Sequence, residues 1–260
     1  MKARQYLMCS LLLLMGALGM TSCVECHRSF VISDNKTVEK RMLSVFEQID
    51  ISGSPTVVYT QSDNFGVRVE GPENLVKKIL TNVDDQTLYI RNKGKMGIVN
   101  FSLGNVADVI VYVSSPDLVG VRMSGSGDFI SRHRVDTDMM NVVLRGSGDI
   151  EFEDIICDAF KMELVGSGDI RINQLEARTS LATLVGSGDV VVNQSNVIDT
   201  NLSLRGSGDI SVNFEKGCQS AQCMLSGSGD IELKGELSHY DGQKKGSGDI
   251  NVNDLTIRGN

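Results

Sequence analysis

The sequence predicts an all-β protein, a parallel β-solenoid or β-helix with coils of about 20 residues. Three observations predict this fold. The tetrapeptide Gly-Ser-Gly-Asp occurs seven times, its first glycines recur every 19 to 21 residues, and apolar and polar residues alternate on both sides of it. A regular period of this length indicates one supersecondary unit stacked on itself. The seven copies are Gly125–Asp128, Gly146–Asp149, Gly166–Asp169, Gly186–Asp189, Gly206–Asp209, Gly227–Asp230 and Gly246–Asp249.

The residues beside each tetrapeptide show a period of two, which is typical of a strand. Ile150 and Phe152 follow one copy with a polar residue between them, and Val142 and Leu144 precede it in the same way. A coil with two short strands cannot bury its apolar side alone, so neighbouring coils must stack. A β-meander is the alternative, but two-residue Asn-Gly or Asp-Gly loops are absent and antiparallel folding does not explain the fixed period.

The first 22 residues have the features of an export signal. Lys2 and Arg4 precede the apolar run Leu7–Leu18, which is too short to span a bilayer comfortably as a helix. Gly19-Met-Thr-Ser-Cys23 resembles the cleavage site of a bacterial lipoprotein signal, which implies that Cys23 carries a lipid; cleavage by an ordinary signal peptidase is the alternative. We therefore expect a signal at 1–22, a polar tether at 23–36, and a protein anchored to the outer membrane on its periplasmic face or at the cell surface.

Charge excludes some partners. The formal net charge is −8, and removal of residues 1–22 takes away Lys2 and Arg4 but no acidic residue, which makes it −10. A chain this acidic is a poor partner for nucleic acid or for an anionic membrane surface. The expected contact with the membrane is therefore the lipid on Cys23, since several acyl chains suffice for stable attachment.

The cysteines do not predict a disulfide framework. Cys157 and Cys218 occupy the same coil position three coils apart, roughly 14 Å at about 4.8 Å per coil, which is beyond disulfide reach. Cys218 and Cys223 are the only nearby pair, and the inward position of Cys223 favours a buried free thiol over a bridge. Cys26 has no obvious mate. The three histidines are scattered along the chain, so no zinc site is expected.

Residues 37–122 show strand patterns without the tetrapeptide, and we expect them to cap the N-terminal end of the solenoid. Strands are predicted around Ile49, Val58, Val67 and Tyr89 and over 106–113, and Glu73–Leu80 after Pro72 is the expected helix. Residues 123–260 then form the seven-copy solenoid, with 37–260 as one continuous domain. A separate small β domain at 37–122 is the alternative. The last copy has Gly242 and Lys244 at apolar positions, as expected of a terminal coil that faces water.

The repeats also resemble a known family. Gly-Ser-Gly-Asp followed by Ile or Val, a segment Phe46-Glu-Gln-Ile-Asp-Ile-Ser-Gly and a lipoprotein signal are similar to the auto-transporter adhesin head GIN domain family, which is common in Bacteroidetes. The resemblance covers about Phe46–Ile257. It implies a fold similar to right-handed β-helices and an adhesin-like role, although the adhesin name of the family rests on architecture.

Stacking predicts two rows of identical side chains as candidate site residues. Aspartates about 4.8 Å apart repel by roughly 1 kcal/mol in water and about 3.5 kcal/mol at an effective dielectric of 20. Hydrogen bonds from corner N–H groups are the expected compensation, and a row of Ca²⁺ ions is the less favoured alternative, since the Gly-Gly-x-Gly-x-Asp pattern of calcium β-rolls is missing. The second row should form an amide ladder. The first row is Asp128, Asp149, Asp169, Asp189, Asp209, Asp230 and Asp249, and the second is Asn173, Asn193, Asn213 and Asn253.

Catalysis is not expected, because an acid and a base need unlike environments and the repeated aspartates are equivalent. A polysaccharide-processing β-helix enzyme would need catalytic residues outside the equivalent aspartates, such as Arg132, His133 and Arg134. The absence of Trp and an aromatic content of 5% disfavour a sugar platform. The sequence therefore favours a non-catalytic, lipid-anchored interaction surface for a protein or glycan ligand, with no cofactor. An envelope scaffold whose coils self-associate end to end is the alternative.

Overall fold

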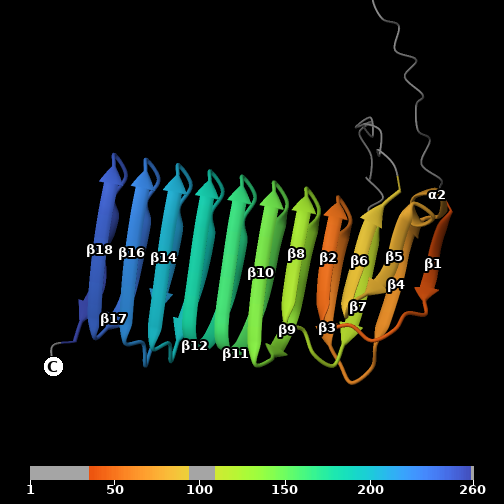
Figure 1. Cartoon of the computed structure of the whole chain (residues 1–260), viewed down its shortest axis with the longest axis horizontal. Coiled ribbons are helices and arrows are strands. Elements are labelled where there is room, and N and C mark those ends of the chain that lie inside the picture. The colour runs from red at the N-terminus through yellow and green to blue at the C-terminus, as the bar shows by residue number, and fades with distance from the viewer. Residues whose placement is uncertain (1–34, 94–108, 259–260) are drawn as a thin grey trace, which may run out of the picture. The chain divides into compact units, whose positions relative to one another are not determined.

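Each repeat forms one coil of a parallel β-solenoid, and the strands of one coil pair with the same strands of the next (Figure 1). The computed structural model describes residues 35–93 and 109–258, which lie within the unit Ile32–Asn260. These residues form 19 strands. Leu144 pairs in parallel with Leu164, and Leu184 with Leu204, so equivalent residues of successive repeats stand side by side. Parallel pairing at this spacing confirms the solenoid and excludes the β-meander.

Two strand layers run along the coils, one before and one after the Gly-Ser-Gly-Asp corner. In the layer before the corner, the paired strands in spatial order are β5 (Ile79–Asp84), β6 (Thr87–Asn92), β2 (Gln48–Gly53), β8 (Gly120–Gly125), β10 (Met139–Gly146), the later parts of β11 (Asp149–Gly166) and β12 (Ile170–Gly186), β14 (Asp199–Gly206), β16 (Ser220–Gly227) and β18 (His239–Gly246).

The layer after the corner contains β1 (Lys36–Arg41), β4 (Gly66–Pro72), β7 (Ile110–Ser115), β3 (Thr56–Gln61), β9 (Asp128–Asp136), the first parts of β11 and β12, β13 (Val190–Ser195), β15 (Ile210–Phe214), β17 (Ile231–Leu237) and β19 (Ile250–Ile257).

The corner depends on glycine for two different reasons. The first glycine has a positive φ, +144° at Gly166, a conformation that residues with a side chain rarely adopt. The second allows neighbouring coils to touch, because a Cβ at Gly168 would lie 1.9 Å from the carbonyl oxygen of Gly148. The carbonyl of Gly146 accepts hydrogen bonds from the N–H groups of Ser167 and Gly168, at 2.9 and 3.2 Å. The corners are therefore stacked backbone on backbone.

The alternating apolar residues form the core between the two layers. Ile150, Phe152 and Leu164 are fully or almost fully buried, as are their equivalents in the following coils as far as Leu225, Ile231 and Leu233. The rings of Phe129 and Phe152 lie 5.2 Å apart, and Tyr59 stacks on Phe129 at 6.2 Å. The Tyr59 hydroxyl hydrogen-bonds the Ser115 hydroxyl at 3.0 Å, and burial raises the pKa of Tyr59 to about 12.

The described cysteines Cys157, Cys218 and Cys223 are free and buried. Cys223 packs in the core near the C-terminal end, where burial raises its pKa to about 12. Burial likewise raises the pKa of Cys157 to about 11. Because only thiolates react as nucleophiles, these thiols are inert packing groups at neutral pH.

The N-terminal end is closed by antiparallel strands. β1 pairs with β4, β4 with β7, and β5 with β6, all antiparallel, while β2 and β3 already pair in parallel with the first repeats through β8 and β9. The helix α2 (Glu73–Val76) packs beside β4 and β1 and buries Leu75 and Val76. This arrangement covers the end of the core with strands that do not belong to the repeat.

The helix is shorter than the sequence predicts. The expected helix Glu73–Leu80 ends at Val76, and Ile79 and Leu80 instead begin β5, where Ile79 pairs with Asn92. The spacing of the apolar residues at 75, 76, 79 and 80 fits two alternatives equally well: one continuous helix, or a short helix with a turn and then a strand. Pairing with β6 favours the second alternative. Of the expected strand at 106–113, the part from Ile110 onward is β7, and residues 106–108 lie outside the described residues.

At the C-terminal end the last coil is polar. Gly242 and Lys244 stand in register with Cys223 and Leu225 of the preceding coil, and β18 is almost entirely exposed. The Tyr240 side chain takes the place of the missing apolar residue, because its hydroxyl lies where a Cβ on Gly242 would be. The Lys244 ammonium donates to the Gly248 carbonyl at 3.1 Å and to the Asp249 carboxylate.

Candidate functional site

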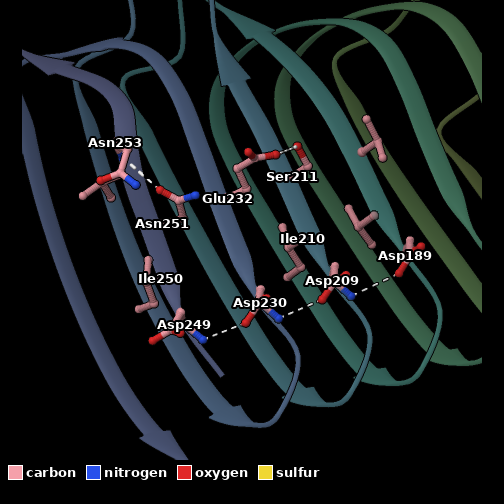
Figure 2. Close-up of a pocket in the computed structure, with 13 residues that line it drawn as sticks. Asp189, Asp209, Ile210, Ser211, Asp230, Glu232, Asp249, Ile250, Asn251 and Asn253 are labelled. Atoms are coloured by element: carbon pink, nitrogen blue, oxygen red, sulfur yellow. Dashed lines mark hydrogen bonds between the residues drawn. The ribbon is translucent and has the colours of Figure 1, made fainter. Parts of the chain in front are cut away.

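The aspartates of the corners form a continuous hydrogen-bonded row. The backbone N–H of Asp169 donates to Oδ1 of Asp149 at 3.0 Å, and the same bond recurs from coil to coil (Figure 2). The further bonds run from Asp189 to Asp169, Asp209 to Asp189, Asp230 to Asp209 and Asp249 to Asp230, at 2.9, 3.1, 2.8 and 2.7 Å. At each of these corners, the carboxylate thus replaces a backbone carbonyl as the acceptor for the N–H of the next coil.

The first corner of the row differs. Asp128 pairs in register with Asp149, and the N–H of Asp149 donates to the carbonyl of Gly127 at 3.3 Å. The hydrogen bonds given above, from an Asp N–H to the carboxylate of the preceding Asp, start with the carboxylate of Asp149. Cys23, the expected lipidation site, lies outside the described residues.

The asparagines do not form one uninterrupted column. The Asn193 amide donates to the Asn173 carbonyl at 2.9 Å, and Asn193 pairs in register with Asn213. Beyond Asn213 the next coil has Lys234, which pairs with Asp254 after a register shift, so Asn253 lies outside the column. The expected four-member ladder is thus reduced to three adjacent positions, because the equivalent residue after Asn213 is Lys234 and the last strand pair carries a bulge.

A shallow groove follows the aspartate row over the last coils. It has a volume of about 720 Å³ and lies along the starts of β13, β15, β17 and β19. Asp189, Asp209, Asp230 and Asp249 form one side, and Ser211 and Glu232 project beside them (Figure 2). Glu232 also pairs with Lys234 at 3.0 Å. The groove is an exposed acidic strip made of equivalent side chains from successive coils.

Metal binding has little support from the geometry. Within residues 35–93 and 109–258 no group of three or more His, Cys, Asp or Glu side chains is placed to hold a metal ion. One oxygen of each carboxylate from Asp149 to Asp230 is already used by a backbone N–H of the next coil. A Ca²⁺ ion takes six to eight oxygen ligands, which a single row of half-occupied carboxylates does not supply.

The Arg132, His133 and Arg134 cluster does not form a reactive pair. Arg132 binds the Glu151 carboxylate at 2.6 Å, and Arg134 binds Asp154 at 2.7 Å. Both carboxylates belong to β11 of the next coil, and both arginine side chains are more than half exposed. These are ion pairs between neighbouring coils on a solvated surface, each worth about 1 kcal/mol or less.

Three buried polar side chains of the repeat coils hydrogen-bond one another. The Gln194 amide donates to the Ser180 hydroxyl at 2.9 Å and its oxygen accepts from the Thr200 hydroxyl at 2.8 Å. All three side chains are almost completely buried, yet none is titratable. The network fixes the packing of one coil and offers no acid, base or nucleophile.

A second hollow lies near the N-terminal cap and was not predicted from the sequence. It has a volume of about 450 Å³ and is lined by residues of β1, β3, β4 and β7 with Met42 and Phe65 at the strand ends. The sequence indicates this hollow only weakly. Met42 is an apolar residue directly after the cations Lys40 and Arg41, and Phe65 follows a turn. No period connects these segments, because the strands that carry them are antiparallel additions to the solenoid.

The Asp209 side chain provides a test of what the aspartate row does. We expect Asp209→Ala to lower the free energy of unfolding by about 1 kcal/mol, because the N–H of Asp230 loses its acceptor. Asp209→Asn keeps an oxygen acceptor and removes one like charge from the row, so it should be neutral or slightly stabilising. Thermal melts followed by circular dichroism measure both.

The same melts with added Ca²⁺ are the control. Neither the wild type nor Asp209→Asn should change its melting temperature with millimolar Ca²⁺. A calcium-dependent rise that is lost in Asp209→Asn would show that the row binds cations and would overturn the structural interpretation.

Fold and surface together define the class of protein: a β-solenoid whose faces carry rows of repeated side chains, with no catalytic constellation among the residues described. The chain belongs to the family described as "Putative auto-transporter adhesin, head GIN domain", whose model matches residues 45–219 and 182–259. No curated protein matched the sequence. The family assignment agrees with the resemblance seen in the repeats.

Solved structures share the fold. A protein described as a "putative adhesin" from Bacteroides fragilis is 24% identical with a TM-score of 0.74, over 84% of this chain and 97% of that one. A "putative lipid binding protein" from Parabacteroides distasonis is 25% identical with a TM-score of 0.66, over 85% and 97%. A "putative adhesin" from the same organism is 19% identical with a TM-score of 0.62, over 84% and 96%.

Of the residues described, none belongs to a helix with the length and apolar character needed to cross a bilayer.

Proposed function

We propose that this protein is a non-catalytic, lipid-anchored β-solenoid of the cell envelope that presents its faces as an adhesin-like interaction surface. The observation that carries the proposal is the equivalence of the carboxylates in the aspartate row. Each carboxylate from Asp149 to Asp230 makes the same bond to the next coil, so no two of them have the unlike environments that an acid and a base require.

Other features support a binding role. Membership of an adhesin family favours display at the envelope, and repeated side chains on stacked coils give the extended surface that solenoid proteins use for recognition. The acidic strip beside Asp209 and Asp230 is complementary to a cationic partner, such as a basic segment of a protein. The expected partner is a protein or glycan, and the charge of −8 disfavours nucleic acid.

End-to-end assembly into a scaffold has less support. Such an assembly would have to pair the free edges of β18 and β19 with another copy. The last coil presents the polar side chains of Lys244 and Lys245 there, with Tyr240 folded over the end of the core. Lysines on an edge strand are a common protection against edge-to-edge pairing. The C-terminal end therefore has the features of a terminus that faces water.

The anchor and the exposure of the domain can be tested in cells. We expect the wild-type protein in the outer-membrane fraction and digestible by protease added to intact cells. Cys23→Ala removes the thiol that would carry the lipid and should move the protein out of the membrane fraction, whereas Cys26→Ala, three residues away, should leave it there.

Each failure has its own meaning in this experiment. Retention of Cys23→Ala in the membrane would contradict the lipid anchor. Protection of the wild type from protease, with a periplasmic marker also intact, would place the domain inside the outer membrane and contradict an adhesin-like role while leaving the anchor in place.

A further inference from the structure

The N-terminal hollow has a cationic side and an apolar side. Strand register places four outward-facing residues in one line across the sheet: Lys40 pairs with Arg68, Arg68 with Tyr112, and Tyr112 with Val58. Three steps of about 4.8 Å make this line roughly 14 Å long. It starts at two positive charges on β1 and β4 and ends at apolar groups on β7 and β3.

The cations are held in place and partly unneutralised. The Arg68 guanidinium lies over the Tyr112 ring, 4.0 Å from its centre, which fixes its position at the middle of the line. Arg68 has one weak ion pair, to Glu70 at 3.5 Å, with both side chains about 40% exposed. Lys40 lies in register with Arg68, and its side-chain ammonium makes no hydrogen bond or ion pair within residues 35–93 and 109–258. The strand pair thus carries a local positive charge on an otherwise acidic chain.

Exposed apolar residues also border the hollow at the ends of β1 and β4. Met42 is 99% exposed, and Phe65 is 41% exposed although its ring packs edge-on against Phe46 at 5.5 Å. Both line the same hollow as Tyr112. Exposed apolar groups that gather in a concave site with a polar rim are typical of a place where a ligand binds.

We propose that this hollow binds a single-chain anionic amphiphile, a fatty-acid-like molecule. Its carboxylate lies between Lys40 and Arg68, close to Met42 and Phe65 at the ends of the same two strands, and its alkyl chain runs over Tyr112 toward Val58. The shape and charge of the site fit this one chemistry: a planar guanidinium suits a carboxylate, and the apolar end of the line has no charged side chain to bind a second polar group. The site is separate from the aspartate row and does not depend on the lipid at Cys23.

The test uses the chain from Val24 onward, which retains every contact described within Ile32–Asn260 and carries no lipid. Titration calorimetry with sodium dodecanoate, below its micelle concentration, should show saturable binding to one site. Decanoate should bind about 15-fold more weakly, because two fewer methylenes are buried and each contributes about 0.8 kcal/mol. Dodecanol, which lacks the charge, should bind at least tenfold more weakly than dodecanoate.

Three variants localise the binding. Met42→Asp places a negative charge at a fully exposed position without affecting packing, and should weaken dodecanoate binding more than tenfold. Arg68→Gln should weaken dodecanoate but leave the affinity for dodecanol almost unchanged. Met224→Asp is the matched control, since Met224 is 50% exposed on the outer side of β16, and it should bind like the wild type.

The proposal would be overturned by no saturable binding of dodecanoate, or by equal binding in Met42→Asp and Met224→Asp. It would also be overturned if light scattering showed a concentration-dependent dimer that Met42→Asp abolishes, because the hollow would then be the contact face of a second copy.

Discussion

Replacement of Gly168 by alanine is expected to destabilise the solenoid by about 3 kcal/mol or more. The added Cβ would lie 1.9 Å from the Gly148 carbonyl oxygen, and both atoms belong to backbones held by the corner hydrogen bonds. Neither coil can move away without breaking the aspartate bond from Asp169 to Asp149 on one side of the corner. The measurement is the urea midpoint followed by far-UV circular dichroism.

Two variants control for this result. Ser167→Ala changes the exposed residue between the two glycines and should shift stability by no more than about 0.5 kcal/mol. Gly242→Ala also creates a close contact, but with the Tyr240 hydroxyl at the end of a side chain in the last coil, which can rotate away, so its cost should be clearly smaller. If Gly168→Ala were as stable as Ser167→Ala, the corners would not be stacked backbone on backbone.

The second large effect is expected for Phe152→Ala, at about 3 to 5 kcal/mol. Phe152 is completely buried and its ring packs against Phe129, which in turn contacts Tyr59 of the cap. Removal of the ring leaves a cavity where the repeat coils meet the N-terminal cap. The urea midpoint again provides the measurement, and Phe152→Leu should recover more than half of the loss.

The control for this prediction lies on the same strand. Val165 projects outward from β11 and is 36% exposed, so Val165→Ala should change stability by less than about 1 kcal/mol. Because repeat proteins can unfold coil by coil, a second probe near the cap is useful. If Tyr fluorescence and circular dichroism give separate unfolding transitions only in Phe152→Ala, the Phe152 ring couples the unfolding of the cap to that of the coils. An unchanged urea midpoint in Phe152→Ala would contradict the central place of this ring in the core.

The repeat region could be predicted almost completely from the sequence. A fixed period of about 20 residues sets the register, since equivalent residues of parallel coils must pair to keep the apolar face inward. It follows that Leu144 stands beside Leu164 and that the aspartates form a row. The period did not predict which group accepts the hydrogen bond from each Asp N–H. From Asp169 onward the acceptor is the side chain of the preceding aspartate, whereas the N–H of Asp149 donates to the carbonyl of Gly127.

The N-terminal region was predicted less well for a physical reason. Outside the repeats no period sets the pairing, so each segment takes the partner that tertiary packing offers. Ile79 and Leu80 fit a helix by spacing, yet they form β5 because the edge of β6 is available. The asparagine column failed in a similar way, since one substitution, Lys234, and one bulge before Asp254 suffice to move Asn253 out of line.

By itself, the sequence determined the solenoid, its corners, its inward residues and the row of aspartates. In a periodic chain, a residue's position in the repeat also tells which residues of the next coils lie beside it. Only the tertiary structure decided how the ends are closed and where an amphipathic hollow forms. Lys40, Arg68 and Tyr112 are far apart along the chain and become neighbours through antiparallel pairing at the cap. Contacts of that kind depend on which strand edges remain free after the coils have stacked, and no local pattern encodes them.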